Sequence, residues 1–260
     1  MKTIITTNGR PNEKSFTNAS LAVDSLGYKF VDRAKRSITR MQEEYDSAVL
    51  VASANRYELY RIGMDKPFFF HPDTAAFRLK RLMNGEKDPF IEATQLQPGD
   101  SFLDCTLGLA SDSILASFIT KEGGKVLGVE GDVDIAFITS EGLRSYTLGS
   151  EELTNAMRRI QVISQDAVTF LQSQPDESWD VIYIDPMFSS PINESTNFAP
   201  LRQVGLQGML TDEWMREAER VCKRRVVVKD HYQSQVFEQF NLNTQIRLNT
   251  KFHFGFHTKN

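Results

Sequence analysis

Two short segments of the chain end an apolar run with an aspartate. Residues 102–112 read Phe-Leu-Asp-Cys-Thr-Leu-Gly-Leu-Ala-Ser-Asp, and residues 181–188 read Val-Ile-Tyr-Ile-Asp-Pro-Met-Phe. A parallel strand that carries a carboxylate at its carboxyl end has this pattern, and open α/β sheets bind ligands outside those ends. We therefore expect Asp104 and Asp185 to face one crevice, where one carboxylate serves a cofactor and the other a substrate.

The loop after Asp104 indicates which cofactor would fit. Gly108 lets the backbone pass close to a ligand, and Ser111 and Asp112 are expected to cap the next helix near a bound cation. A pyrophosphate would favour a Gly-x-Gly-x-x-Gly turn, whereas this loop has a single glycine between two aspartates. This disfavours an NAD-linked oxidoreductase. An acidic loop suits a sulfonium cation, so the pattern predicts S-adenosylmethionine (SAM)-dependent methyl transfer to a nitrogen.

Two further strand ends are acidic. Glu130 ends the apolar run 125–130 and is expected to accept hydrogen bonds from both ribose hydroxyls of an adenosine, although a solvated charge is the alternative. Asp166 follows the run 160–164. Its side chain could accept the adenine amino group or cap the following helix.

The segment Asp185-Pro186-Met187-Phe188 supplies the candidate catalytic residues Asp185, Pro186 and Phe188. Pro186 biases Asp185 toward an extended backbone. Asp185 could then accept hydrogen bonds from an exocyclic amine, and Phe188 could stack on the base. Because the lone pair of such an amine is delocalised into its ring, orientation and electrostatics are expected to supply most of the rate. The alternative is a turn proline beside a core phenylalanine.

Basic residues lie near these segments and on two expected helices. Lys229 follows the apolar run 225–228 and could contact a phosphate or pair with Asp185. The expected helices span 73–83 and 32–45, and each basic face could track a substrate or be merely solvated. The candidate phosphate contacts are Arg78, Lys80 and Arg81 on the first helix, and Arg33, Lys35, Arg36 and Arg40 on the second, where Arg33, Arg36 and Arg40 would share one stripe.

From residue 101 onward, expected strands and helices alternate, which predicts a mainly parallel sheet. The expected strands are 101–105, 125–130, 160–164, 180–185 and 224–229, and the expected helices are 111–120, 133–145, 154–157, 167–172 and 211–222. Segments 245–248 and 252–257 are expected to add an antiparallel hairpin at the sheet edge. We predict a small N-terminal α/β lobe at 1–62, a connector with a basic helix at 63–97, and a methyltransferase domain at 98–260.

Composition limits the partners. The 260 residues carry a formal net charge of −4, so a polyanion would have to be bound by a local patch. The two cysteines and four histidines show no zinc spacing or disulfide framework, and we expect no metal. The N-terminus lacks a signal-peptide core, and no apolar run approaches the roughly 20 residues of a membrane span. A cytoplasmic protein that does not engage a membrane is expected.

Three of these motifs resemble the family of small-subunit (16S) ribosomal RNA guanine-N2 methyltransferase J. Residues 104–112 resemble its Asp-Ala-Thr-Ala-Gly-Leu-Gly-Arg-Asp segment, residues 184–188 its Leu-Asp-Pro-Met-Phe-Pro segment, and residues 225–229 its fifth strand. The resemblance covers about 75 to 258. It implies a class I (Rossmann-like) methyltransferase fold, SAM as cofactor, and 16S rRNA or the small ribosomal subunit as partner. The implied cofactor positions are Ser111, Asp112, Glu130, Gly131, Asp166, Ala167 and Asp185.

The sequence also departs from this family. Ala110-Ser111 stands in place of Gly-Arg, and Asp166-Ala167 in place of two serines. A divergent branch with another target is therefore an open interpretation. The leading hypothesis is methylation of a guanine N2 amine in 16S rRNA. The alternatives are a SAM-dependent methyltransferase for DNA, protein or a small molecule, and a non-catalytic module that binds SAM or RNA.

Overall fold

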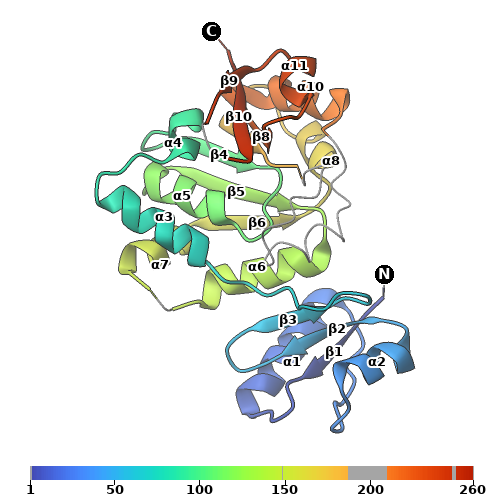
Figure 1. The fold of residues 1–260 in the computed structure, drawn as a ribbon. Helices are drawn as coiled ribbons and strands as arrows, with labels where there is room; N and C mark the ends of the chain where they lie inside the picture. Colours follow the sequence, from blue (N-terminus) through green and yellow to red (C-terminus); the bar gives the residue numbers. More distant parts are fainter. Residues whose placement is uncertain (1, 148, 187–209, 248–249, 260) are drawn as a thin grey trace.

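The computed structural model describes residues 2–147, 149–186, 210–247 and 250–259 (Figure 1). The described strands form a three-stranded sheet and a seven-stranded sheet. Figure 1 shows the smaller sheet in a lobe below the larger α/β unit, with the N-terminus in that lobe and the C-terminus at the opposite end of the molecule. The residue limits that we assigned to lobe, connector and methyltransferase domain stay a prediction.

The small lobe is built on β1 (Thr3–Thr7), which pairs in parallel with β2 (Ala48–Ala52). β3 (Tyr57–Tyr60) adds an antiparallel edge to β2. Every residue of β1 and β2 is buried, because α1 (Glu13–Leu26) and α2 (Ile38–Tyr45) pack against this sheet.

The second helix of the lobe is shorter than we predicted. We expected a helix over 32–45, whereas α2 begins at Ile38. Ala34 and Lys35 have φ angles of 45° and 61°, in the left-handed region that a right-handed helix does not contain. This turn separates three side chains that we expected on one helical stripe: Arg33, Arg36 and Arg40.

The seven-stranded sheet has the order β6-β5-β4-β7-β8-β10-β9. Its strands are β4 (Ser101–Asp104), β5 (Lys125–Glu130), β6 (Ile160–Ser164), β7 (Trp179–Ile184), β8 (Cys222–His231), β9 (Asn243–Gln245) and β10 (Phe252–Thr258). The strands from β6 to β8 are parallel, and β10 pairs antiparallel with both β8 and β9. The predicted mainly parallel sheet with an antiparallel C-terminal hairpin is confirmed, although the first hairpin strand is β9 at 243–245 and not the predicted 245–248.

Helices cover both faces of this sheet. They are α3 (Asp73–Met83), α4 (Pro89–Thr94), α5 (Ser111–Thr120), α6 (Val133–Ser145), α7 (Glu151–Arg158), α8 (Ala167–Gln172), α10 (Asp212–Val221) and α11 (Val236–Gln239). The predicted bounds of α5, α6 and α8 are confirmed. α7 is longer than the predicted 154–157, because Ser150 caps it by accepting a hydrogen bond from the Leu153 N–H.

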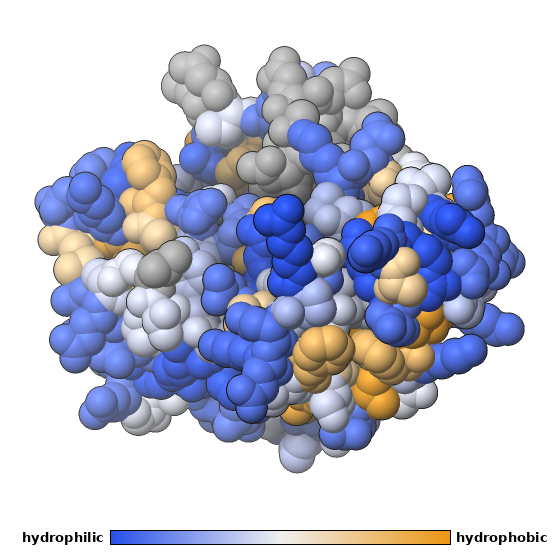
Figure 2. All heavy atoms as spheres, turned by 90° about the horizontal axis from the view of Figure 1, so that it is seen from below, coloured by the Kyte–Doolittle hydropathy of each residue, from blue (hydrophilic) through white to orange (hydrophobic). Residues whose placement is uncertain are grey.

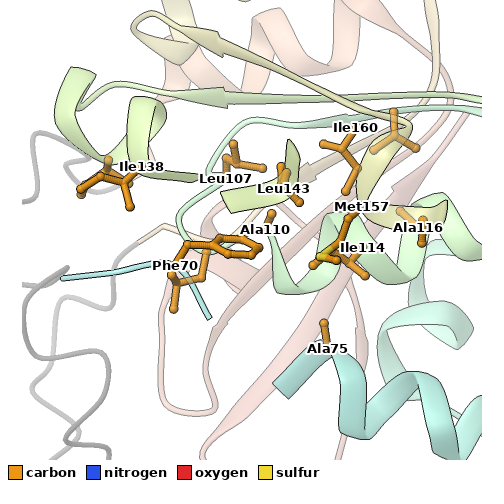
Figure 3. Packing of buried hydrophobic residues seen from close by; sticks show 14 of the residues in the cluster. Phe70, Ala75, Leu107, Ala110, Ile114, Ala116, Ile138, Leu143, Met157 and Ile160 are labelled. Atoms are coloured by element: carbon orange, nitrogen blue, oxygen red, sulfur yellow. The ribbon is translucent and has the colours of Figure 1, made fainter. Parts of the chain in front are cut away.

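Successive side chains of the central strands point to opposite faces of the sheet and so contribute to two separate hydrophobic cores. Phe102 of β4 packs with α3 to α7, whereas its neighbour Leu103 packs with α8, α10 and α11. Strands buried on both faces are apolar in nearly continuous runs, which is why the sequence pattern predicted them. Figure 3 shows the first core, where Phe70 of the connector points toward the helices. A Cβ on Gly142 would lie 2.1 Å from the Phe70 ring, so this glycine allows the connector to pack on α6.

The molecular surface is largely hydrophilic on the face seen in Figure 2, where apolar areas are smaller and separate. Within the described ranges, no helix combines the length and the apolar character needed to cross a lipid bilayer.

Candidate active site at the carboxyl edge of the sheet

The structure places Asp104 and Asp185 on adjacent strands at one edge of the sheet. Asp104 is the last residue of β4 and is aligned with Tyr183 of β7. Thr106 connects the two aspartates: its N–H donates to Asp104 Oδ1 at 2.9 Å, and its Oγ1 accepts the Asp185 N–H at 2.8 Å. The expected crevice between the two strand ends therefore has a defined hydrogen-bonded geometry.

Asp104 is a buried carboxyl group with an unusual protonation equilibrium. Its Oδ2 accepts a hydrogen bond from Ser113 Oγ at 2.6 Å. Burial raises the pKa of Asp104 to about 7, and the nearby carboxylates of Asp112 and Asp185 act in the same direction, although the Ser113 and Thr106 hydrogen bonds oppose the shift. Near neutral pH this group can therefore gain or lose a proton when a charged ligand arrives.

Neither Ser111 nor Asp112 caps α5 as we expected. Ala110, with φ 59°, is the N-cap of this helix, and the Asp112 side chain turns into the protein. It accepts hydrogen bonds from Arg78 Nη1 at 2.6 Å and from the Tyr183 hydroxyl at 2.8 Å, and Lys229 Nζ lies 3.4 Å away. Burial alone would raise the pKa of Asp112, but Lys229 and Arg78 outweigh it and hold this pKa well below its usual range.

Arg78 also differs from our expectation of a phosphate contact. Its guanidinium donates to both oxygens of Asp88, at 2.9 and 2.8 Å, in addition to Asp112. Such a bidentate geometry fixes the planar group firmly. Arg78 is therefore an interior cation that connects α3, α4 and α5, and it is not placed to reach an RNA strand. The exposed cations on α3 are Lys80 and Arg81.

Lys229 and Asp185 form the ion pair at the centre of the edge. Lys229 Nζ lies 2.6 Å from Asp185 Oδ2, so the pairing alternative for this lysine is observed. Burial raises the pKa of Asp185, and the attraction of Lys229 opposes that rise. Pro186 follows directly, whereas Phe188 lies outside the described residues, so its stacking role stays a prediction.

Glu130 is the last residue of the adjacent strand β5. Its Oε2 accepts the Gly108 N–H and its Oε1 accepts the Asp132 N–H, both at 3.0 Å. Burial raises the pKa of Glu130 to about 7 against these hydrogen bonds. A Cβ built on Gly131 would meet no atom within 4 Å, so there is open space beside the turn that follows Glu130.

Asp166 shows the capping alternative that the sequence left open. Its Oδ1 accepts hydrogen bonds from the Thr169 N–H and the Thr169 hydroxyl, each at 2.9 Å, which fixes the start of α8. Ala167 is buried in the core on that face. Contact of Asp166 or Ala167 with an adenine stays a prediction.

The lobe contacts this edge through residues that no sequence pattern indicated. Arg61 directly follows β3, and its Nη2 lies 2.6 Å from Asp132 Oδ2 and 3.4 Å from Asp134 Oδ2. Thr3 of β1 donates to Asp134 at 2.9 Å. Because the Asp132 N–H binds Glu130, the lobe holds the turn that carries this carboxylate. An arginine after a strand gave no local signal of a partner seventy residues away.

Comparisons with known proteins show which family and fold this chain has. Residues 33–254 match the family described as "Putative SAM-dependent methyltransferase". The chain belongs to this SAM-dependent methyltransferase family. A solved SAM-dependent methyltransferase from Neisseria gonorrhoeae shares the fold, with a TM-score of 0.58 and 17% identity, over 98% of this chain and 95% of that one. The class I methyltransferase fold expected from the sequence is thereby confirmed.

Two relatives show how far the sequence similarity extends. YpiP of Bacillus subtilis, an uncharacterized protein, is 42% identical over 252 residues, which cover 97% of this chain and 98% of YpiP. The ribosomal RNA small subunit methyltransferase J of Acinetobacter baylyi is 36% identical over 113 residues. That alignment covers 43% of this chain and 40% of the Acinetobacter protein, so the chain matches less than half of that relative.

SAM is the cofactor of this methyltransferase, and the donor set at the sheet edge fits it. Asp104 and Glu130 end neighbouring strands, and Gly131 leaves space directly after Glu130. Carboxylate oxygens can accept hydrogen bonds from ribose hydroxyls and attract a cation, and each carboxylate offers about four acceptor positions. When bound, SAM supplies an electrophilic methyl group on a sulfonium. Within the described ranges, no group of three or more His, Cys, Asp or Glu could hold a metal ion.

The loop between Asp104 and α5 is seated by a glycine in β5. A Cβ on Gly128 would lie 2.2 Å from Leu107 Cδ1. The Leu107 N–H donates to the Val129 carbonyl at 3.1 Å, and Thr139 Oγ1 donates to the Gly108 carbonyl at 2.7 Å. These contacts place the Gly108 N–H on Glu130. The position of the loop thus depends on the absence of a side chain at Gly128.

Gly128→Ala is expected to weaken SAM binding about tenfold or more, because the added methyl group must push Leu107 and the loop out of place. Overpacking of this kind typically costs about 1–3 kcal/mol. Isothermal titration calorimetry with SAM measures the change. The matched control is Gly9→Ala, where a Cβ would meet no atom within 4 Å. Equal affinities of wild type and Gly128→Ala would show that the loop does not form the SAM site.

The raised pKa values of Asp104 and Glu130 predict a pH-dependent affinity. A cationic ligand favours the ionised carboxylates, so SAM affinity should increase from pH 6 to pH 8, by up to about tenfold per pH unit for each group that must ionise. The stability of the free protein depends on pH with the opposite sign. The stabilisation that comes from the raised pKa values of Asp104 and Glu130 is fully present below the unfolded pKa near 4 and is lost as pH rises through about 7. Calorimetry with SAM from pH 6 to pH 8 tests the affinity, and thermal unfolding of the free protein from pH 4 to pH 8 tests the stability.

S-adenosylhomocysteine is the control ligand, because it lacks the sulfonium charge. Its affinity should depend less on pH than that of SAM. Identical pH profiles for the two ligands would contradict an electrostatic role of these carboxylates.

Proposed function

We propose that this SAM-dependent methyltransferase methylates the exocyclic N2 amine of a guanine in 16S rRNA, as isolated RNA or within the small ribosomal subunit. The observation that carries this proposal is the position of Asp185-Pro186 beside Asp104, with the Asp185 backbone held by Thr106 and its carboxylate held by Lys229. The similarity to the ribosomal RNA small subunit methyltransferase J of Acinetobacter baylyi, which is 36% identical over 113 residues, supports the RNA target.

In this proposal Asp185 orients the amine. Its carboxylate accepts an N–H of the substrate and so turns the nitrogen toward the methyl donor. Lys229 keeps the carboxylate fixed on one side, and Pro186 restricts the backbone at the turn. Burial raises the pKa of Asp185, which also suits it to take the proton that the nitrogen loses after methylation. Because the amine is a weak nucleophile, this orientation is the main contribution of the chain.

The exposed face of α3 is the proposed track for the RNA strand. Lys80 and Arg81 lie on this face, next to Phe77, which is 64% exposed. The Arg81 guanidinium carbon Cζ lies 5.8 Å from the centroid of the Phe77 ring, and Arg81 Nε lies 2.7 Å from Glu86 Oε2. A cationic and aromatic surface of this kind can bind phosphates and bases of single-stranded RNA without sequence preference.

The double variant Lys80→Glu, Arg81→Glu is expected to weaken binding of 16S rRNA and to reduce its salt dependence, because two phosphate contacts are lost. SAM affinity should stay the same. Filter binding at several salt concentrations measures the slope of log RNA affinity against log salt concentration. The control is Arg144→Glu, Arg216→Glu, which reverses two cations with 68% and 67% exposed side chains on α6 and α10. An unchanged slope in the α3 variant would support the solvated-face alternative.

The substrate class is tested by transfer of a labelled methyl group from SAM. Small ribosomal subunits, extracted 16S rRNA, DNA and total protein are offered separately, and labelled RNA is digested to nucleosides for mass spectrometry. We expect N2-methylguanosine from one or both RNA substrates. Label in protein, in DNA or in a small molecule alone would reject the RNA proposal, and binding of SAM without any transfer would identify a non-catalytic module.

A further inference from the structure

The connection between β9 and β10 carries an arginine next to the proposed site. β10 begins with Phe252, which pairs with His231, the last residue of β8. This places the start of β10 at the same sheet edge as Asp185. The guanidinium of Arg247 lies 4.7 Å from the centroid of the Phe252 ring and 5.9 Å from that of Phe254. Lys229 Nζ lies 5.0 Å from the same Phe252 ring.

Arg247 differs from the other cations around this edge in its charge balance. Arg78 contacts two carboxylates, and Lys229 lies close to two. Arg247 forms no ion pair with a carboxylate of the described residues, and it is held by the faces of two phenylalanine rings. A cation that is stacked but has no carboxylate partner keeps its N–H donors available for an anionic ligand.

The backbone of Arg247 is fixed as well. Its N–H donates to His253 Nδ1 at 3.3 Å, and its carbonyl accepts a hydrogen bond from Thr250 Oγ1 at 3.2 Å. Partial burial lowers the pKa of Arg247, and Arg78 acts in the same direction, whereas Asp88 and Glu92 oppose it. The guanidinium stays charged at neutral pH. Ordering of such a side chain before binding reduces the entropy that a ligand contact would otherwise cost.

We infer that Arg247, stacked on Phe252, binds a backbone phosphate of the nucleotide next to the methylated one. This inference rests on the proposed RNA substrate. A planar guanidinium presents paired N–H groups that match two phosphate oxygens, and the net charge of −4 leaves RNA binding to such local cations. Arg247 would thus position the strand so that its neighbouring base reaches Asp185. This contact is separate from the proposed contact of the α3 surface, which would bind a more distant part of the same RNA strand.

Arg247→Gln and Arg247→Lys test the inference, with Arg216→Gln on α10 as the control. The probe is a fluorescein-labelled single-stranded RNA of twelve uridines, followed by anisotropy at several salt concentrations, and extracted 16S rRNA for methylation. In Arg247→Gln the slope of log affinity against log salt should fall by about 0.7, the value for one phosphate contact on a single strand. Arg247→Lys should keep the slope but bind less tightly, because a lysine does not reproduce the stacked fork. Arg216→Gln should match wild type.

The readouts separate this inference from the proposed function. If wild type binds and methylates RNA but Arg247→Gln keeps the full salt slope, the Arg247 contact is rejected while the RNA function stands. If wild type neither binds nor methylates RNA, the function itself is rejected. SAM affinity, measured by calorimetry, should be equal in all variants. A loss of SAM affinity in Arg247→Gln with an unchanged salt slope would instead assign this arginine to the cofactor and overturn the inference.

Discussion

Asp185→Asn is expected to slow methyl transfer by roughly 10²–10³-fold, the scale for loss of one preorganised electrostatic contact. Asparagine keeps the size and shape of the side chain but replaces a charged acceptor with a neutral amide. The backbone hydrogen bond from residue 185 to Thr106 does not depend on the side chain, so the turn should persist. The change therefore weakens the hydrogen bond that orients the amine, and removes the group that takes its proton, without displacing the strand end.

Single-turnover kinetics with labelled SAM on extracted 16S rRNA measures this effect apart from product release. Binding of RNA and of SAM should change little. The matched control is Asp180→Asn at the opposite end of β7, where the carboxylate accepts hydrogen bonds from the Ser101 N–H and hydroxyl at 2.8 and 2.5 Å. That variant should lose stability but keep its transfer rate per folded molecule. A wild-type rate from Asp185→Asn would remove Asp185 from the proposed mechanism.

The strand ends of the site could be predicted because they depend on local patterns. Asp104, Glu130 and Asp185 each end an apolar run, and parallel strands bring their carboxyl ends to one edge of the sheet. The bounds of α5 and α6 were predicted correctly, although the N-cap of α5 is Ala110 and not one of the polar residues that we expected there. The strand order does not follow from such patterns, since strands adjacent in the sheet, such as β4 and β7, are far apart in the sequence.

The pairing of Lys229 with Asp185 was one of two alternatives in the sequence, but the partners of Asp112 could not be predicted in the same way. Asp112 receives Arg78 from α3 and Tyr183 from β7, and these contacts exist only after both elements pack against α5. One signal was available. Arg78 falls between Ala75, Leu79 and Leu82, at the 3–4 residue spacing of the inward face of a helix. An arginine within an apolar stripe indicates an interior ion pair, and this pattern separates Arg78 from Lys80.

The α2 helix shows a different limit. Residues 32–45 are charged and contain no glycine or proline, and the one signal of a later helix start is Ser37, whose Oγ accepts the Arg40 N–H at 3.1 Å as the N-cap of α2. The left-handed turn at Ala34 and Lys35 is stabilised by a local hydrogen bond from the Ala34 N–H to Asp32 Oδ1 at 3.1 Å and by contacts with α2. Arg36 of this turn binds Glu44 at 2.8 Å and lies 5.6 Å from the Tyr45 ring centroid. Tertiary and medium-range contacts of this kind override local helix propensity.

Lys229→Met is expected to lower the free energy of unfolding by about 3 kcal/mol, the lower end of the range for breaking a buried ion pair from one side. Lys229 neutralises two carboxylates, and its removal leaves Asp185 as an unpaired charge, whereas Asp112 keeps Arg78 and Tyr183. The lower end applies because the side chains of Lys229 and Asp185 are 17% and 24% exposed, so water compensates in part.

Urea unfolding at pH 7 measures this loss, with Lys223→Met as the control. Lys223 lies 3.6 Å from Asp180, and their side chains are 46% and 29% exposed, so that pair should contribute at most about 1 kcal/mol. Without Lys229 the pKa of Asp185 should rise further, so the variant should regain stability as pH falls toward the unfolded value near 4. Adding Asp185→Asn to Lys229→Met should also restore part of the loss, because it removes the unpaired charge. Equal losses in Lys229→Met and Lys223→Met, or no recovery in the double variant, would show that the pair does not hold this edge of the sheet together.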